Sequence, residues 1–117
     1  MTDAQKRLEI LVAKAGGEAV SRRGYASAID VFIGIGWLSR ESFDAWRAGK
    51  VPYLERVVTA NLSKISQAMK TFRTWARHSN LEPSQTIYKH KSHQLRFSKS
   101  GSPSIEESYR THFVLKK

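Results

Sequence analysis

The chain has no cysteine among its 117 residues, which excludes disulfides, thiolate metal sites and a thiol nucleophile. It also lacks an apolar run of about 20 residues, the length that spans a bilayer, and residues 1–10 contain no apolar signal-peptide core. Acidic residues are scarce, because 10 Asp and Glu stand against 20 Lys and Arg for a net charge of +10. We therefore expect a cytoplasmic protein that makes no membrane contact.

The apolar pattern predicts a mainly α fold in a single domain, residues 1–117. Between Pro52 and His78, apolar residues recur every three or four positions, as on one face of an α-helix. Pro52 suits a first helical turn, and Asn80 with Pro83 would end the helix. We expect one long central helix over about 52–78, with the other elements packed along it as a small helical bundle.

Glycines divide the chain before this helix into three shorter helical segments. Thr2 or Asp3 would cap a first helix that stops at Gly16-Gly17, and a second would run from Tyr25 to the glycines around Ile35. Ser39 would cap a third, which Gly49 ends. The predicted bundle occupies residues 1–80.

The C-terminal part, residues 84–117, has a different pattern. Two short runs rich in strand formers, 86–90 and 94–98, are separated by three residues and predict a β-hairpin over about 86–98. Ser102 and Pro103 are a good cap and first-turn residue for a short C-terminal helix that would carry Phe113.

The positive charge is concentrated in one part of the chain. From Arg56 to Lys99 there are nine basic residues and one acid, Glu82, the pattern of a phosphate-backbone binder. A solvated face that keeps the chain soluble is the alternative for any single run. We predict that the phosphate contacts are Lys70, Arg73 and Arg77 on one flank of the central helix, and Lys89, Lys91, Arg96 and Lys99 in and after the hairpin. Tyr88, flanked by Lys89 and His90, is the candidate for stacking on an exposed base.

Residues 28–52 carry a pattern of glycines, a hydroxyl cap and aromatic residues, with matching positions at Gly34, Ile35, Ser39, Phe43, Trp46, Gly49, Lys50 and Pro52. This segment resembles the helix-turn-helix of excisionase-type DNA-binding proteins. The resemblance implies that Arg40, Arg47 and Lys50 contact a DNA groove while Phe43 and Trp46 pack inward. Glycine-separated helices with a buried tryptophan also occur in small helical bundles of other kinds, and that interpretation stays open.

We expect a non-enzymatic nucleic-acid-binding protein, with DNA ahead of RNA as the partner. An RNA-binding protein, or a metal-independent ribonuclease or toxin using His90 and His93, is the alternative. A module that binds an acidic protein is a second alternative. We predict no cofactor, no metal site and no catalytic residue. A wide apolar helix face can pack into the core or form a dimer interface, so a homodimer is a further alternative.

Overall fold

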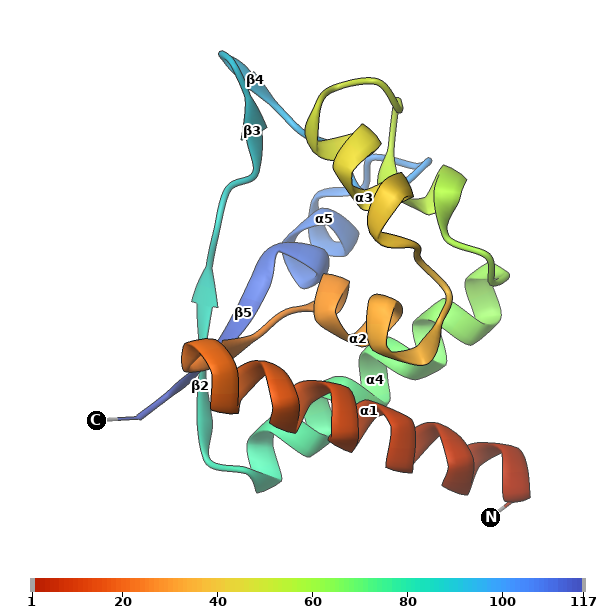
Figure 1. Ribbon diagram of the computed structural model, residues 1–117, viewed down its shortest axis with the longest axis vertical. Helices are drawn as coiled ribbons and strands as arrows, with labels where there is room; N and C mark the ends of the chain where they lie inside the picture. Colours follow the sequence, from red (N-terminus) through yellow and green to blue (C-terminus); the bar gives the residue numbers. More distant parts are fainter. Residues whose placement is uncertain (1, 117) are drawn as a thin grey trace.

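The computed structural model describes residues 2–116, and within them the fold is mainly helical with two small antiparallel sheets (Figure 1). The helices are α1 (Asp3–Arg23), α2 (Ala28–Ile35), α3 (Arg40–Arg47), the 3-10 turn η1 (Leu54–Val57), α4 (Leu62–His78) and α5 (Pro103–Arg110). The strands are β1 (Tyr25–Ala26), β2 (Leu81–Gln85), β3 (Lys89–His90), β4 (His93–Gln94) and β5 (Thr111–Leu115).

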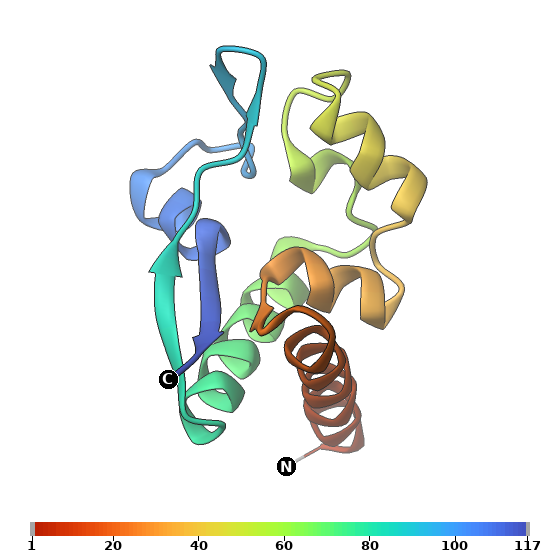
Figure 2. The ribbon, with the colours of Figure 1, turned by 60° about the vertical axis from the view of Figure 1, so that its left-hand side comes forward.

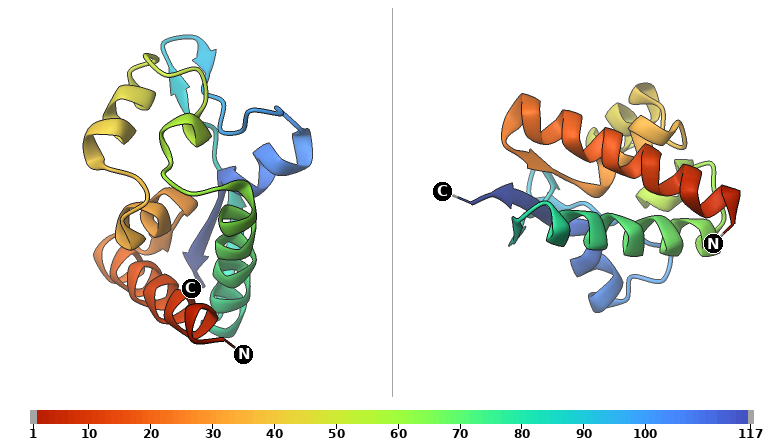
Figure 3. Two further views of the ribbon diagram at one scale, coloured as in Figure 1. Left: turned by 90° about the vertical axis from the view of Figure 1, so that its right-hand side faces the viewer. Right: turned by 90° about the horizontal axis from the view of Figure 1, so that it is seen from below.

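Two long helices, α1 and α4, lie side by side at one end of the molecule, and α2 packs against α1 (Figures 1 and 3). Glycines allow these close approaches. A Cβ added at Gly34 of α2 would lie 2.5 Å from the Ala15 Cβ of α1, and one added at Gly16 would lie 2.5 Å from the Trp75 ring of α4. Since real Cβ atoms do not approach so closely, glycine is required at both crossings.

A three-stranded sheet covers one side of the helices, with the C-terminal strand β5 between β1 and β2. Strand β2 is an edge strand, and Pro83 in its middle faces Phe113 of β5. Proline has no N–H to donate, so it fits where the backbone nitrogen points away from the neighbouring strand. Pro83 therefore leaves the open edge of β2 without a central donor and hinders the addition of a further strand.

One apolar core joins the helices to the sheet and to the segment before α5. Its largest fully buried side chains include Trp46, Phe32, Phe72 and Phe97. Phe72 meets Phe113 edge to face at 5.1 Å, and Phe97 stacks on Tyr109 at 5.2 Å. These contacts hold α4, β5, α5 and the hairpin segment against one another.

The predicted central helix over 52–78 is wrong in its first third. Only residues 62–78 form an α-helix, and the η1 turn lies before it. The Leu54 N–H donates to the Arg96 carbonyl at 3.1 Å, and the Thr59 N–H donates to the Trp37 carbonyl at 2.8 Å. In a continuous helix the Thr59 N–H would donate to the Glu55 carbonyl, so its long-range bond to Trp37 marks a break in the helical hydrogen bonding. Asn61 is exposed and caps α4, accepting from the Lys64 N–H at 2.8 Å.

The predicted stop at Gly16-Gly17 is also wrong, because α1 continues to Arg23 and ends at the left-handed Gly24. Packing against α2 and α4 outweighs the intrinsic cost of two helical glycines, about 1 kcal/mol each. The second helix begins at Ala28, after the strand β1, with Ser27 and Asp30 forming a capping box.

Several local predictions are confirmed. Ser39 caps α3, Asn80 has a positive φ of 61° and Pro103 lies in the first turn of α5. The hairpin is present but shorter than 86–98, since its paired residues are only 89–90 and 93–94. Phe113 belongs to the strand β5 and not to the last helix.

Candidate nucleic-acid interface

The β3–β4 hairpin lies against the C-terminal end of α3 (Figure 2). The Arg47 guanidinium donates to the Lys89 carbonyl at 3.3 Å and lies 5.5 Å from the centre of the Tyr88 ring. Gly49, with a φ of 76°, faces His90 so closely that an added Cβ would lie 2.9 Å from the His90 ring. A helix end and a hairpin whose contacting residues are 42 positions apart in the sequence thus form one surface.

The buried Trp46 side chain holds α3 and the hairpin segment together. It is fully buried, and its indole N–H donates to the Arg96 carbonyl at 2.8 Å. Its ring contacts Phe97 and Tyr88, with centroids 4.9 and 5.7 Å away. Because α3 and the segment around the hairpin share this tryptophan, their relative position is set by the core and not by the surface charges.

The cations at this end are free of carboxylate partners. Among residues 2–116, ion pairs within 4 Å form only between Asp30 and the two arginines Arg22 and Arg23. Lys50, Lys89 and Lys91 are exposed, and Lys91 has the positive φ of 57° that closes the hairpin turn. Together with Arg47 they form what we name the α3–hairpin surface: Arg47, Lys50, Lys89 and Lys91.

Three other predicted contacts, Arg96, Arg40 and Lys99, are not part of the α3–hairpin surface. The Arg96 guanidinium donates to the carbonyl of Ser98 at 2.7 Å and to that of Lys99, so it holds the loop after the hairpin. Arg40, predicted as a groove contact, is exposed on the first turn of α3 and lies over the Phe43 ring at 5.8 Å. Lys99 is exposed.

The structure separates the three predicted phosphate contacts of the central helix from the α3–hairpin surface. Lys70, Arg73 and Arg77 are exposed on α4. Lys70 borders a groove between α4 and α1, whereas Arg73 borders two smaller grooves between α4 and α5. The predicted phosphate contacts therefore belong to two surfaces, one on α4 and one at the hairpin, and not to a single one.

Tyr88 is not an exposed platform. Its ring packs on Trp46 and meets Phe97 edge to face at 5.3 Å, and its hydroxyl bonds to the His112 Nε2 atom at 2.6 Å. Burial raises the pKa of Tyr88 to about 12. This geometry does not favour stacking on a base, and we leave Tyr88 out of the proposed interface.

His112 is a residue that sequence analysis missed. It lies on β5, stacks on Tyr25 at 4.8 Å and bonds to Thr86 at 3.2 Å as well as to Tyr88. Arg23 covers Tyr25 at 4.3 Å. Burial lowers the pKa of His112, with Asp30 opposing and Arg23 reinforcing that effect. No local pattern indicates this cluster, because it forms only when β5 enters the sheet.

His90 and His93 face each other across the hairpin as paired residues. Residues 2–116 contain no group of three or more His, Cys, Asp or Glu side chains arranged to hold a metal ion. In the same part of the chain, no helix has both the length and the hydrophobicity that a bilayer crossing demands.

Comparisons of the chain with protein-family models, curated proteins and solved structures find no match. The resemblance of residues 28–52 to excisionase-type proteins stays a prediction. In the structure, α3 packs mainly against η1, while α2 packs mainly against α1.

Proposed function

We propose that this protein binds nucleic acid, with duplex DNA ahead of RNA, through the α3–hairpin surface. The observation that carries the proposal is the docking of the hairpin on the end of α3, which gathers Arg47, Lys50, Lys89 and Lys91 without a carboxylate partner. Cations held in this way attract phosphates and release counterions on binding.

The arrangement resembles that of many DNA-binding proteins, in which a helix end and a neighbouring hairpin contact the same duplex. The α3 helix also carries Glu41 and Asp44, both exposed. Carboxylates repel phosphates, so we place the contacts at the C-terminal end of α3, where Arg47 and Lys50 lie, and not along its whole length.

The test is fluorescence-polarisation binding to duplex DNA, duplex RNA and single strands of each, over about 50 to 200 mM salt. We expect duplex DNA to bind with an affinity that falls steeply as salt rises. Absence of binding to every probe at physiological salt would overturn the proposal and favour an acidic protein partner.

The RNA-directed alternative depends on the hairpin histidines. If the protein cleaves RNA in EDTA, and the double variant His90→Ala, His93→Ala loses that cleavage, the function is a metal-independent ribonuclease. His90 contacts Gly49, so the single variant His93→Ala, at an exposed position, separates a chemical role from a packing effect.

A further inference from the structure

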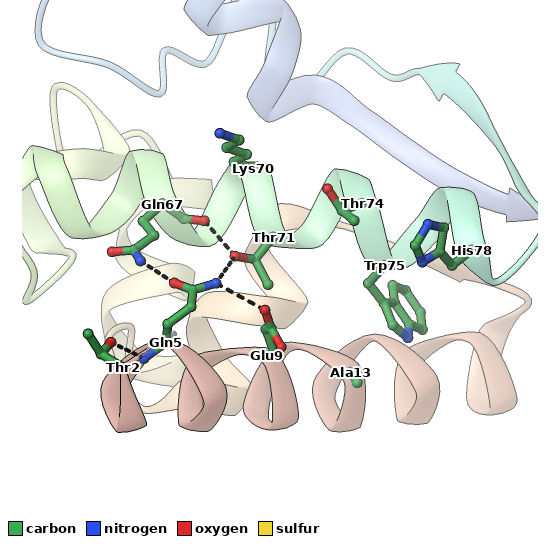
Figure 4. A pocket seen from close by; sticks show the side chains of 10 residues that line it. All are labelled: Thr2, Gln5, Glu9, Ala13, Gln67, Lys70, Thr71, Thr74, Trp75 and His78. Carbon is green, nitrogen blue, oxygen red and sulfur yellow. Dashed lines mark hydrogen bonds between the residues drawn. The ribbon is translucent and has the colours of Figure 1, made fainter.

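A groove of about 760 Å³ runs along the surface between α1 and α4 (Figure 4). It is lined from α1 and the residue before it by Thr2, Gln5, Glu9 and Ala13, and from α4 by Gln67, Lys70, Thr71, Thr74, Trp75 and His78. The α3–hairpin surface lies at the other end of the molecule (Figure 1). The volume of the groove is within the usual range of ligand sites, about 300–1,000 Å³.

A hydrogen-bonded bridge closes one half of this groove. The Gln5 amide donates to Glu9 at 3.3 Å and to Thr71 at 3.5 Å, and the Gln67 amide donates to Gln5. Thr71 in turn donates to the Gln67 carbonyl at 2.8 Å. Figure 4 shows this bridge beside an open half that contains Trp75, Ala13 and His78.

The Trp75 ring is held in a fixed position in the open half. Its six-membered ring fills the space that a side chain at Gly16 would occupy, and its plane is within 13° of that of Phe72, 6.2 Å away. The indole is only half-buried and lines the groove. Ala13, opposite on α1, has a small side chain that leaves room beside the ring.

The chemical character of the side chains that line the groove favours one class of ligand. An aromatic ring with neutral amides and hydroxyls suits a planar group with hydrogen-bonding edges, and base–aromatic stacking has this chemistry. Glu9 is the one carboxylate in the lining and already accepts a hydrogen bond from Gln5. Lys70 at the rim and Arg77, two turns further along α4, are exposed and form no ion pair within residues 2–116. They suit the phosphates attached to such a base.

We propose that this groove binds an unpaired base of single-stranded nucleic acid, stacked on Trp75, with neighbouring phosphates at Lys70 and Arg77. The inference rests on the proposed function and adds a second, single-strand site to it. A base inside a duplex is stacked between its neighbours and cannot enter the groove.

The experiment measures the binding of fluorescein-labelled oligo(dT) and oligo(U) of about 12 nucleotides, a length typical of single-strand sites, and of a DNA duplex. The variant Ala13→Gln fills the open half without adding charge, and Trp75→Leu removes the stacking ring. Ser21→Gln, at an exposed position on α1 outside the groove, is the matched control. Intrinsic fluorescence supplies a second readout, with Trp37→Phe correcting for the other half-buried tryptophan.

We expect Ala13→Gln and Trp75→Leu to weaken single-strand binding about tenfold and to leave duplex binding and the Ser21→Gln control unchanged. Wild-type fluorescence should fall on binding, and Trp75→Leu should abolish that change. The oligo(dT) and oligo(U) arms show which strand type the groove prefers.

Single-strand affinity unaltered in Ala13→Gln would overturn the groove site, and this result decides the matter even if Trp75→Leu fails to fold. In that case duplex binding would persist and the proposed function would stand. If the wild-type protein binds none of the probes, both proposals fail together.

Discussion

The charge of the α3–hairpin surface gives a quantitative prediction. In the triple variant Lys50→Gln, Lys89→Gln, Lys91→Gln, three exposed cations without carboxylate partners are lost. Each phosphate contact contributes about 0.9 to the slope of log affinity against log salt for duplex DNA, so three contacts contribute about 2.7. Over a fourfold change in salt, from about 50 to 200 mM, the wild-type affinity should fall about 40-fold more than that of the variant.

The folded state should be little affected, because exposed substitutions usually change the free energy of unfolding by less than about 0.5 kcal/mol. A thermal melt checks this directly. The matched control is Lys6→Gln, Arg7→Gln, Lys14→Gln on α1, which removes the same charge from exposed positions outside the α3–hairpin surface. If both triple variants change the salt slope equally, the interaction follows net charge alone and the argument for a specific surface is refuted.

Three further predictions concern other parts of the fold. Gly16→Ala should lower the free energy of unfolding by about 1–3 kcal/mol through overpacking against Trp75. Gly17→Ala, with open space around it, should raise the free energy of unfolding by about 0.5–1 kcal/mol. Urea unfolding of the two variants measures whether each one is less or more stable than the wild type. The lowered pKa of His112 means that the unfolded chain takes up a proton first as the pH falls through about 6.5, so stability should decrease from pH 7.5 to pH 5, and His112→Phe should show a weaker decrease. Replacing Lys70, Arg73 and Arg77 together by Gln should weaken single-strand binding with almost no change in melting temperature, and unaltered affinity for single strands would exclude phosphate contacts on α4.

The features that sequence analysis predicted correctly are those decided within a few residues. Ser39 caps α3 through its own side chain, which accepts from the Ser42 N–H at 3.0 Å. Pro103 lies in the first turn of a helix because its fixed φ suits that place. Asn80 takes the left-handed conformation just after α4. Caps and turns need no distant partner, so the sequence around them is sufficient.

The features that it missed depend on partners far along the chain. The last helix was predicted to carry Phe113, yet residues 111–115 form the middle strand of a sheet, between β1 and β2. The apolar spacing before residue 62 fits a helix, yet Leu54 and Thr59 donate backbone bonds to Arg96 and Trp37. Tertiary hydrogen bonds and packing override local propensity at these places. Gly16 offered a signal, since a glycine inside a helical pattern often marks a close packing contact.

The candidate site shows the same limit in its electrostatics. From the sequence, the basic residues between Arg56 and Lys99 form one group, but the fold distributes them over two ends of the molecule. At one end, Trp46 and Gly49 bring a hairpin onto α3 and concentrate point charges that suit a phosphate backbone. At the other, Gly16 leaves room for the Trp75 indole in the open half of a groove whose lining also includes neutral amides and hydroxyls, an environment that suits a base. Since the two surfaces share no residue, mutations should separate duplex binding from single-strand binding, and a variant that impairs both equally without unfolding would show that the division is wrong.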